Sequence, residues 1–463
     1  MKIAICASEV VPFAKTGGLA DVGGALPLAL EKLGQEVIIV MPGYKKVHDL
    51  KAPAIKTLKE GISCSRIGKG IKVYFIDSDK YFDRQELYGD KSGDYKDNLD
   101  RFAYYSRRTL ELLKELKFNA DIIHCHDWQS ALIPVYLRTL YAEDDFYKKT
   151  RTIFTIHNIG YQGLFAKEEF PKLGLDWDVF TMNKLEYYDK VNVLKGGIVF
   201  SDIVNTVSDT YSKEIQTKEF GFGMEGILNQ RRNSLFGIIN GLDYSIWDPA
   251  TDKNLVKGFS LKDMEGKAEN KEALQKMCKL PVKQNVPLFG IVSRLAQQKG
   301  FDILAAGIDT ICKMDLQMAI LGTGDLKYHQ VMEAMVKKYP KVISLFLKFD
   351  DCLAHRIYAG SDIFLMPSKY EPCGLGQMIS LKYGTVPLVF KTGGLADTVT
   401  PKNGFVFDKY SKDDLISTVK KAVKAFKAKK SWQELVASGM KCNFSWNESA
   451  KKYVQLYERA KGK

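Results

Sequence analysis

The heptapeptide Lys-Thr-Gly-Gly-Leu-Ala-Asp occurs twice in this chain of 463 residues, at 15–21 and again at 391–397. Each copy follows an apolar run typical of a buried strand and precedes a helical pattern. Seven identical residues in a row make coincidence a poor explanation. We therefore expect two similar domains that face each other across a deep cleft. Both glycine loops should lie at the carboxyl ends of strands, where open α/β sheets bind ligands.

Short apolar runs alternate with amphipathic stretches along most of the chain, which predicts repeated βα units around parallel sheets. The predicted strands form two series, at 3–6, 37–40, 73–76, 122–125, 153–156, 203–206 and 236–239, and then at 288–292, 318–321, 342–347, 363–366, 386–390 and 405–407. The fold class is therefore α/β, with one Rossmann-like domain for each series.

The segment between the two series, residues 240–283, is polar and rich in Asp and Lys, as expected of an interdomain connection. We place the first domain at 1–243 and the second at 244–444. The last segment, 445–463, has an apolar helical face that needs a surface to cover, and we expect it to pack back on the first domain.

Composition narrows the class of protein. Lys and Arg number 68 against 55 Asp and Glu, a net charge of +13 that attracts phosphorylated small molecules as readily as nucleic acid. Much of the excess lies in a lysine-rich helical segment, 420–430, without the interleaved aromatic residues of a nucleic-acid groove. Scattered cysteines without a CxxC pair are typical of reduced thiols. We predict a cytoplasmic protein with neither nucleic-acid nor membrane partners.

The first glycine loop has the character of a phosphate-binding turn. Gly17, Gly18, Gly23 and Gly24 surround a predicted helix start, where bare backbone N–H groups can approach an anion, and Lys15 adds a positive charge. Taken alone, however, this spacing is more typical of a simple tight turn than of a phosphate site. The spacing matches neither GxGxxG nor GxxxxGK[ST], so the sequence supports no dinucleotide cofactor and no P-loop.

Two further clusters follow strands of the second series. Arg294 and Lys299 would lie at the ligand-binding edge, where two cations can neutralise a diphosphate leaving group, although a solvated surface pair is the alternative. Glu371 is placed to face a sugar, with free backbone amides at 374–376 beside it. Cys373 has no His or Asp nearby in the sequence, so a packed thiol is favoured over a nucleophile.

The first series carries a histidine-rich cluster. His124 and His126 resemble part of a metal motif, but no third ligand stands at a suitable spacing, and we expect the two side chains to alternate across their strand. We therefore predict no metal. His157 and Asp127, at adjacent strand ends, suit contacts to sugar hydroxyls, with satisfied structural polar groups as the alternative.

Taken in order, KTGGLADVGGALP, HCHDWQ, TIHNIGYQG, NTVSDTY, INGLDYSIWDP, SRLAQQKGFD, LGTGD, EPCGLGQ and KTGGLADTV cover nearly the whole chain. This series resembles the bacterial glycogen and plant starch synthases. The resemblance implies the GT-B arrangement of two Rossmann-like domains. It also implies transfer of glucose from ADP-glucose, with retention, to the non-reducing 4-hydroxyl of glycogen or a maltooligosaccharide, without metal or other cofactor. The oligomeric state stays open.

Carried over by motif, the resemblance assigns three groups of residues. The catalytic group is His157, Glu371, Arg294, Lys299 and Asp127. The donor-binding group is Lys15, Gly17, Gly18, Gly322, Cys373, Gly374, Leu375 and Gly376. The acceptor-side group is Asp21, Tyr95 and Asn240.

The chain departs from the family pattern at two places. Gly376 stands where many relatives carry Thr, and Lys348-Phe349 stands where a Gly-Tyr pair is common. A Phe keeps a face on which adenine can stack. Three alternatives remain: a related transferase that uses UDP-glucose or an acceptor such as sucrose or a sugar phosphate, a non-catalytic glucan-binding protein, and a dehydrogenase, which the missing glycine fingerprint disfavours.

Overall fold

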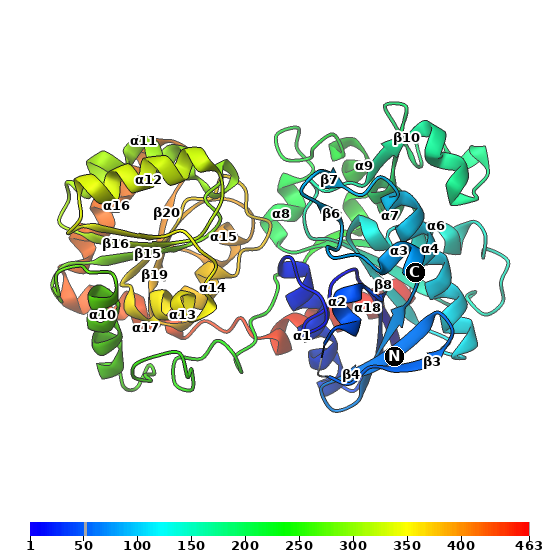
Figure 1. Ribbon diagram of the computed structural model, residues 1–463, viewed down its shortest axis with the longest axis horizontal. Coiled ribbons are helices and arrows are strands. Elements are labelled where there is room, and N and C mark those ends of the chain that lie inside the picture. Colours follow the sequence, from blue (N-terminus) through cyan, green and yellow to red (C-terminus); the bar gives the residue numbers. More distant parts are fainter. Residues whose placement is uncertain (51–52, 463) are drawn as a thin grey trace. The chain divides into compact units, whose positions relative to one another are not determined.

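The computed structural model describes residues 1–50 and 53–462 and divides the chain into two compact units (Figure 1). Unit 1 comprises Met1–Gly241 and Trp446–Lys463, of which Lys463 lies outside the described residues. Unit 2 comprises Leu242–Ser445. The boundaries predicted from the sequence, at 243/244 and 444/445, lie next to these.

Unit 1 is built on a nine-stranded sheet in the order β14-β13-β9-β8-β1-β2-β5-β4-β3. Neighbours from β14 to β5 pair in parallel, and β4 and β3 add an antiparallel edge. The central strands are buried on both faces, as is usual for parallel strands, and β1 and β2 are largely apolar, whereas β8, β9 and β13 also bury polar residues such as His124, Thr155 and Asn205. The strands are β1 Lys2–Cys6, β2 Glu36–Pro42, β3 Lys56–Lys59, β4 Ile62–Ile67, β5 Ile71–Ile76, β8 Ile122–His126, β9 Arg151–Ile156, β13 Ile203–Thr206 and β14 Leu235–Gly237.

The remaining elements of unit 1 cover this sheet or extend from it. Small sheets are formed by β6 Gly89–Asp90 with β7 Gly93–Asp94, and by β10 Leu164–Ala166, β11 Glu186–Tyr187 and β12 Lys190–Asn192. The helices are α1 Gly18–Lys32, α2 Lys45–His48, α3 Asp79–Phe82, α4 Asn98–Glu115, α5 Asp127–Ser130, α6 Leu132–Arg138, α7 Val193–Phe200, α8 Asp209–Glu214, α9 Glu225–Gln230 and the final helix α18 Trp446–Lys461. Helix α18 packs against α1 and β9, and buries Ala450, Tyr453 and Tyr457.

Unit 2 contains a six-stranded, wholly parallel sheet in the order β17-β16-β15-β18-β19-β20. Its strands are β15 Leu288–Val292, β16 Gln317–Leu321, β17 Ile343–Phe346, β18 Ile363–Met366, β19 Val386–Phe390 and β20 Phe405–Phe407. Its helices are α10 Glu265–Met277, α11 Phe301–Cys312, α12 Leu326–Lys338, α13 Asp351–Gly360, α14 Gly376–Lys382, α15 Gly393–Thr398, α16 Lys412–Phe426 and α17 Lys429–Met440.

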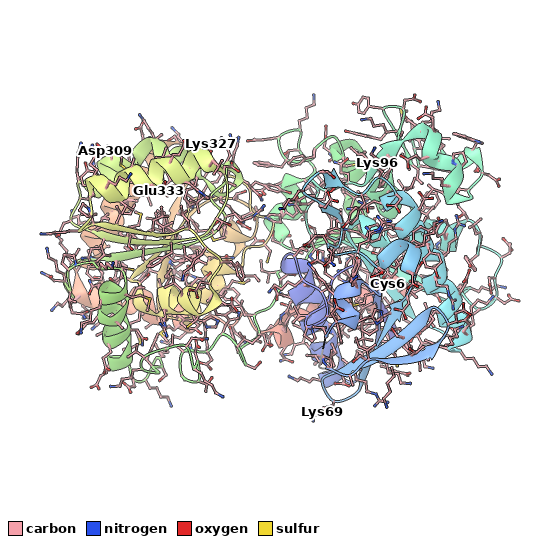
Figure 2. The ribbon with its side chains drawn as sticks, in the orientation of Figure 1. Cys6, Lys69, Lys96, Asp309, Lys327 and Glu333 are labelled. Atoms are coloured by element: carbon pink, nitrogen blue, oxygen red, sulfur yellow. The ribbon has the colours of Figure 1, made fainter. Side chains whose placement is uncertain are left out.

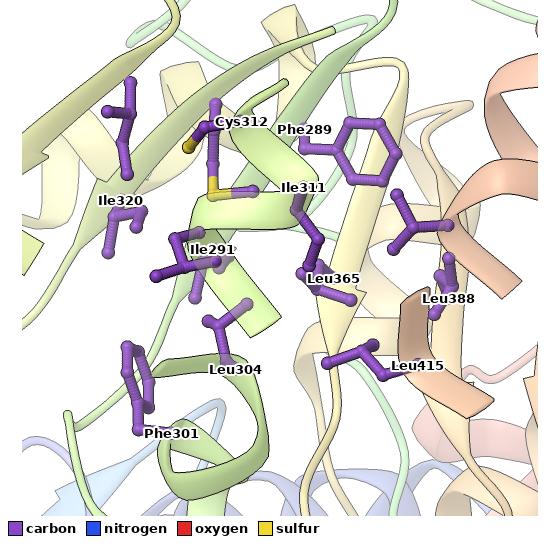
Figure 3. Packing of buried hydrophobic residues seen from close by; sticks show 14 of the residues in the cluster. Phe289, Ile291, Phe301, Leu304, Ile311, Cys312, Ile320, Leu365, Leu388 and Leu415 are labelled. Atoms are coloured by element: carbon purple, nitrogen blue, oxygen red, sulfur yellow. The ribbon is translucent and has the colours of Figure 1, made fainter. Parts of the chain in front are cut away.

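Helix α11 seals one face of this sheet. Phe289 and Ile291 of β15 pack with Leu304 of α11 and with Leu365 and Leu388 of the neighbouring strands (Figure 3). The opposite faces of α11 and α12 carry charge, as Figure 2 shows for Asp309, Lys327 and Glu333. This sheet is therefore a rigid base for the loops at its carboxyl edge.

The strand order creates one switch point in each sheet. In unit 2 the chain leaves β15 toward β16 and β17, and later leaves β18 toward β19 and β20 on the other side. In unit 1 the connections diverge in the same way between the neighbouring strands β1 and β8. Loops that part at such a point leave a crevice between them, which is where open α/β sheets bind ligands.

The structure corrects two predictions about local structure. The segment 240–283 is not merely a connection, because α10 lies within it and packs against α13 in unit 2. The strand predicted at 236–239 is shorter and begins one residue earlier, as β14. In the part of the chain that the structure describes, no helix combines the length and apolar character needed to cross a bilayer.

Candidate active site

A cavity of about 170 Å³ opens at the switch point of unit 2. It is bounded by the ends of β15 and β18 and by the loops that follow them. Three of the predicted catalytic residues, Arg294, Lys299 and Glu371, line it. Leu375 and Gly376, predicted to bind the donor, line it as well.

Lys299 and Glu371 form a close ion pair in this cavity. The Lys299 Nζ lies 2.6 Å from Glu371 Oε2, and the side chains are only 18% and 9% exposed. The Ser368 hydroxyl donates to the same carboxylate oxygen at 3.0 Å. A charge-assisted bond shielded from water holds both groups in fixed positions. Each partner stabilises the charge of the other, so both are prepared to face a charged or polar ligand.

Arg294 is placed differently. Its side chain is exposed, and its guanidinium makes one long contact, 3.4 Å from Gln298 Oε1. The backbone beneath it is fixed, because Leu295 exchanges hydrogen bonds of 2.8 Å with Thr323 and Asp325. The guanidinium therefore has donors available for an anion, whereas Lys299 is already paired with a carboxylate.

The predicted donor residue Gly322 belongs to the loop that supports Arg294. A Cβ at Gly322 would collide with the Ser293 carbonyl oxygen, and its φ of +154° disfavours other residues. Gly324 meets Leu295 in the same way. These glycines let the loop after β16 approach the loop after β15.

The second heptapeptide lies beneath Glu371. Thr392, Gly393 and Gly394 are buried, and the Gly394 N–H donates to the carbonyls of Glu371 and Pro372, each at 3.1 Å. A Cβ on Gly393 or Gly394 would collide with the backbone of the loop at 371–373. This copy follows β19, one strand away from the switch point, and it packs against the backbone of the loop that carries Glu371.

The loop after Glu371 is tightly turned and packed. Cys373 is 7% exposed, and Gly374 has a φ of +71° that favours glycine. A Cβ on Gly376 would lie 2.9 Å from Phe364 and 3.1 Å from the Tyr358 hydroxyl. The packing of these aromatic residues therefore gives a physical reason for glycine at position 376 in this chain.

In unit 1, the first heptapeptide is held by a residue that the sequence reasoning missed. The carboxylate of Glu9, 4% exposed, accepts hydrogen bonds from the backbone N–H and hydroxyl of Thr16 and from the Gly17 N–H. Tyr88 donates to the same carboxylate at 2.7 Å. The signal in the sequence was a carboxylate within the apolar stretch that follows β1. Glu9 fixes the loop at the switch point of unit 1.

The four glycines of this loop serve two purposes. A Cβ on Gly23 or Gly24 would lie 2.6 Å from the Glu9 carbonyl oxygen or 2.8 Å from that of Val11, so these two allow α1 to pack closely. Gly17 and Gly18 are exposed, and a Cβ there would meet nothing within 4 Å. Internal packing therefore does not require glycine at 17 and 18, whereas close approach of a ligand would.

Lys15 and Asp21, predicted on the donor and acceptor sides, form an exposed ion pair of 2.7 Å across the same loop. Their side chains are 55% and 35% exposed. An exposed pair of this kind contributes little to stability, so it can open at low cost when a ligand arrives.

His126, Asp127 and His157 meet at the carboxyl ends of β8 and β9. The His126 Nδ1 lies 2.9 Å from the His157 Nε2, and the His157 backbone N–H donates to Asp127 Oδ1 at 2.7 Å. Asp127 has a φ of +54°, a strained conformation that the first turn of α5 and these hydrogen bonds hold in place. The two predicted site residues thus lie together.

The expectation that His124 and His126 alternate across the strand was wrong. Residues two apart in a strand share a face, and their ring centroids are 4.1 Å apart. Both ring nitrogens of His124 are hydrogen-bonded: Nδ1 lies 2.8 Å from the Tyr457 hydroxyl, and Nε2 lies 2.6 Å from the Thr155 hydroxyl. Across residues 1–50 and 53–462, no three His, Cys, Asp or Glu side chains gather as metal ligands would.

Burial perturbs the protonation of this cluster. Desolvation lowers the pKa values of His124 and His157 to about 3, with the charge of His157 adding to the effect on His124. Desolvation raises the pKa of Asp127 to about 7, opposed by the hydrogen bond from the His157 backbone. The histidines are therefore neutral at pH 7, and Asp127 can exchange a proton near neutrality.

Acid should destabilise unit 1 through these histidines. Because their pKa values are lower in the folded chain, their stabilising contribution is complete above about pH 6.5 and is lost as the pH falls toward 3. The raised pKa of Asp127 acts with the opposite sign between about pH 4 and 7. At pH 5, unfolding lets His124, His126 and His157 each bind about one proton while Asp127 releases about one, so these four groups take up about two protons, at about 1.4 kcal/mol per proton per pH unit. Calorimetry in buffers of different ionisation enthalpy measures this uptake, and a value near zero would contradict it.

An aromatic pocket of about 600 Å³ lies beside this cluster in unit 1. It contains Tyr95, predicted on the acceptor side, and further lining residues that the sequence reasoning did not assign, among them Trp128, Tyr161, Phe165, Tyr187 and Phe222. These aromatic residues belong to segments that are separated in the sequence and come together only in the fold, so no local pattern marked them as a group. Asn240, the third acceptor-side residue, is buried after β14 and does not line this pocket.

Known proteins resemble this chain in sequence along nearly its whole length. A sequence model of the starch synthase catalytic domain matches residues 2–230, and that of glycosyl transferases group 1 matches residues 274–436. The glycogen synthase of Geotalea uraniireducens is 50% identical, with 99% of each chain covered. The chain belongs to the glycogen synthase family. The glycogen synthase of Thermosipho africanus is 44% identical, with both chains covered completely.

Solved structures agree with this family. The catalytic domain of starch synthase IV from Arabidopsis thaliana, bound to ADP and acarbose, matches with a TM-score of 0.88 and 35% identity, covering 100% of this chain and 99% of the other. A sucrose-phosphate synthase from Thermosynechococcus elongatus, 16% identical over 99% of this chain and 98% of its own, has a TM-score of 0.64 and shares the fold. This glycogen synthase family member is a glycosyltransferase with two Rossmann-like domains of the GT-B fold. It elongates an α-glucan with glucose.

Proposed function

We propose that the chain transfers glucose from ADP-glucose to the 4-hydroxyl at the non-reducing end of an α-1,4-glucan, with retention at the anomeric carbon. The bond between C1 and the diphosphate oxygen breaks, and ADP leaves with the electron pair. The acceptor oxygen bonds to C1 on the same face, and its proton passes to the departing phosphate. The observation that carries the proposal is the buried Lys299–Glu371 pair beside Arg294, a site for a sugar diphosphate.

The cations of unit 2 are assigned to the leaving group. Arg294 has uncommitted guanidinium donors, and the Lys299 side chain is only 18% exposed. Both charges favour the diphosphate most strongly when the bond to glucose is broken, which is the requirement for catalysis. Glu371 faces the glucosyl group, and the backbone at 373–376 lies beside the phosphates. In unit 1, Lys15 and the open glycines at 17 and 18 contact the donor phosphates.

The acceptor is assigned to unit 1. A cavity of about 600 Å³ with aromatic walls suits a glucan chain, because the apolar faces of glucose pack on aromatic rings while its hydroxyls reach polar groups. Tyr95 provides such a ring, and Lys96, also labelled in Figure 2, brings a charged end to the same pocket. His157 contacts the glucosyl group, and Asp127 holds His157 in place by accepting a hydrogen bond from its backbone N–H. Asp21 and Asn240, which do not line this pocket, are assigned to the acceptor side on the family resemblance alone.

Phe349 is assigned to the adenine. This residue follows β17 and is 92% exposed, so packing within the chain gives no reason for an aromatic side chain at this position. Stacking on a base would cover it. Phe349→Ala is expected to raise the KM for ADP-glucose about tenfold with kcat little changed, whereas Phe349→Tyr should match the wild type. Steady-state kinetics at saturating glycogen measure both, and an unchanged KM for Phe349→Ala would remove the assignment.

The proposed reaction uses no metal, since Arg294 and Lys299 supply the positive charge near the diphosphate. We expect turnover to persist after dialysis against EDTA, and added Mg²⁺ to change it less than twofold. Loss of activity that Mg²⁺ restores would contradict this part of the proposal.

The function is tested by incubating the chain with glycogen and either ADP-[¹⁴C]glucose or UDP-[¹⁴C]glucose, followed by counting label in the polymer. We expect label from ADP-glucose and much less from UDP-glucose. Label from UDP-glucose alone would change the donor, and label only on sucrose or a sugar phosphate would change the acceptor. No transfer to any acceptor would leave a glucan-binding protein as the remaining explanation.

A further inference from the structure

Three imidazole rings form a row at the end of β8 in unit 1. The rings of His124 and His126 lie 4.1 Å apart between centroids, and those of His126 and His157 lie 5.2 Å apart, each pair tilted by 32°. His126 is completely buried, whereas His157 is partly exposed. The middle ring therefore lies behind the ring that the proposed function places against the sugar.

The hydrogen bond between His126 and His157 requires a hydrogen on one, and only one, of the two nitrogens in contact. Two neutral imidazoles can share a hydrogen bond only if one nitrogen carries hydrogen and the other presents a lone pair. The atoms in contact are His126 Nδ1 and His157 Nε2, at 2.9 Å. Burial lowers the pKa values of both rings far enough that both are neutral at pH 7. Two arrangements are then possible, with the proton on either nitrogen.

The other nitrogen of His126 decides between them. Among the described residues, the buried Nε2 of His126 has no hydrogen-bond partner. If His157 were the donor, His126 would carry its own proton on Nε2, and a buried N–H would be left without an acceptor. If His126 is the donor, its Nε2 is a bare lone pair instead. Orphaned buried N–H groups are rarer than unsatisfied acceptors, so the second arrangement is favoured.

We propose that His126 is a positioning residue: it donates its Nδ1–H to His157 and thereby holds His157 as the tautomer with hydrogen on Nδ1. The free edge of His157 then offers an N–H donor, which suits a sugar hydroxyl oxygen. Asp127 holds the same residue through its backbone N–H at 2.7 Å. Ring and backbone are thus fixed by two different partners. The role of this donor in turnover rests on the proposed function, whereas the tautomer does not.

The tautomer can be measured directly on the resting protein. The chain has six histidines, so ¹⁵N-histidine labelling gives six ring systems, and the signals of His157 are identified by their loss in His157→Asn. Two-bond ¹H–¹⁵N correlation at pH 7.5 should show His157 with a protonated Nδ1 and a bare Nε2, and His126 likewise. Finding hydrogen on Nε2 of His157 would overturn the proposal, whatever the chain catalyses.

Substitution tests the consequence for turnover. His126→Phe keeps a ring in the row but removes the N–H, and should lower kcat about 10- to 100-fold, by analogy with the loss when the hydrogen-bond partner of a metal-bound histidine is removed. His126→Asn restores a side-chain N–H and should recover part of this loss. Histidine signals in His126→Phe should show His157 moving toward the other tautomer, an effect that simple loss of packing would not produce.

Each remaining outcome counts for or against the proposal. Wild-type kcat in His126→Phe would overturn the positioning role. Equal losses in His126→Phe and His126→Asn, with the wild-type tautomer retained at His157, would also overturn it. If wild-type protein transfers no glucose from any nucleotide sugar, the proposed function fails, and the tautomer measurement still decides this inference.

Discussion

Lys299→Ala is expected to lower kcat for glucan elongation about 10²- to 10³-fold, the range seen when one preorganised donor to a developing charge is removed. Two effects combine. The departing diphosphate loses a cation in a site where water is scarce, and Glu371, 9% exposed, loses the ammonium 2.6 Å away. The KM for the donor should change less than kcat, because the interaction is strongest in the transition state.

The control for this variant is Lys420→Ala, which removes a lysine from the exposed face of α16. It should leave kcat within twofold of the wild type. Arg294→Ala should lower kcat as well but leave the melting temperature unchanged, since Arg294 is exposed and makes a single long contact. Near wild-type turnover in both Lys299→Ala and Arg294→Ala would end the leaving-group assignment.

The same substitution in the two heptapeptides should affect stability very differently. Gly394→Ala places a methyl group against the Cys373 carbonyl and disturbs the backbone that carries Glu371. We expect a loss of about 3 kcal/mol, which at about 2–4 °C per kcal/mol lowers the melting temperature of unit 2 by roughly 6–12 °C. Turnover should fall with it, because Glu371 moves.

Gly18→Ala is the matched variant in the first copy. A methyl group there meets nothing within 4 Å, so stability should be unchanged or slightly higher. Turnover should nevertheless fall about tenfold or more, since the methyl group stands where the donor phosphates are proposed to approach. Calorimetry and the glycogen assay compare the variants side by side. Equal melting temperatures for Gly18→Ala and Gly394→Ala would contradict the structural distinction.

Much of the fold follows from the local pattern. The strands β13, β15, β18, β19 and β20 have the predicted bounds, because continuous apolar runs between turn residues define buried parallel strands. The final helix was also foreseen: of the four residues on its predicted apolar face, Ala450, Tyr453 and Tyr457 are buried and Val454 is only partly buried. The hairpin of β3 and β4 was missed because β3 is exposed along its whole length and lacks an apolar pattern.

The site could be predicted only in part. Clusters at strand ends identified Lys299, Glu371, Asp127 and His157, because carboxyl ends of parallel strands share one edge. Their pairing, and the support of Glu371 by the second heptapeptide, depend on strand order. That order arises from long-range packing that no local pattern encodes. Glu9 was overlooked for the same reason, since its partner Tyr88 is distant in sequence.

The return of α18 to unit 1 has a consequence for synthesis. Unit 2 is an uninterrupted segment, whereas unit 1 is completed by α18, which is synthesised after all of unit 2. Until then the sites for Tyr453 and Tyr457, beside α1 and β9, stay uncovered. The nascent chain can therefore complete its second unit before its first. A stop codon in place of Trp446 would uncover the parts of α1 and β9 that α18 covers, while leaving all of unit 2 encoded.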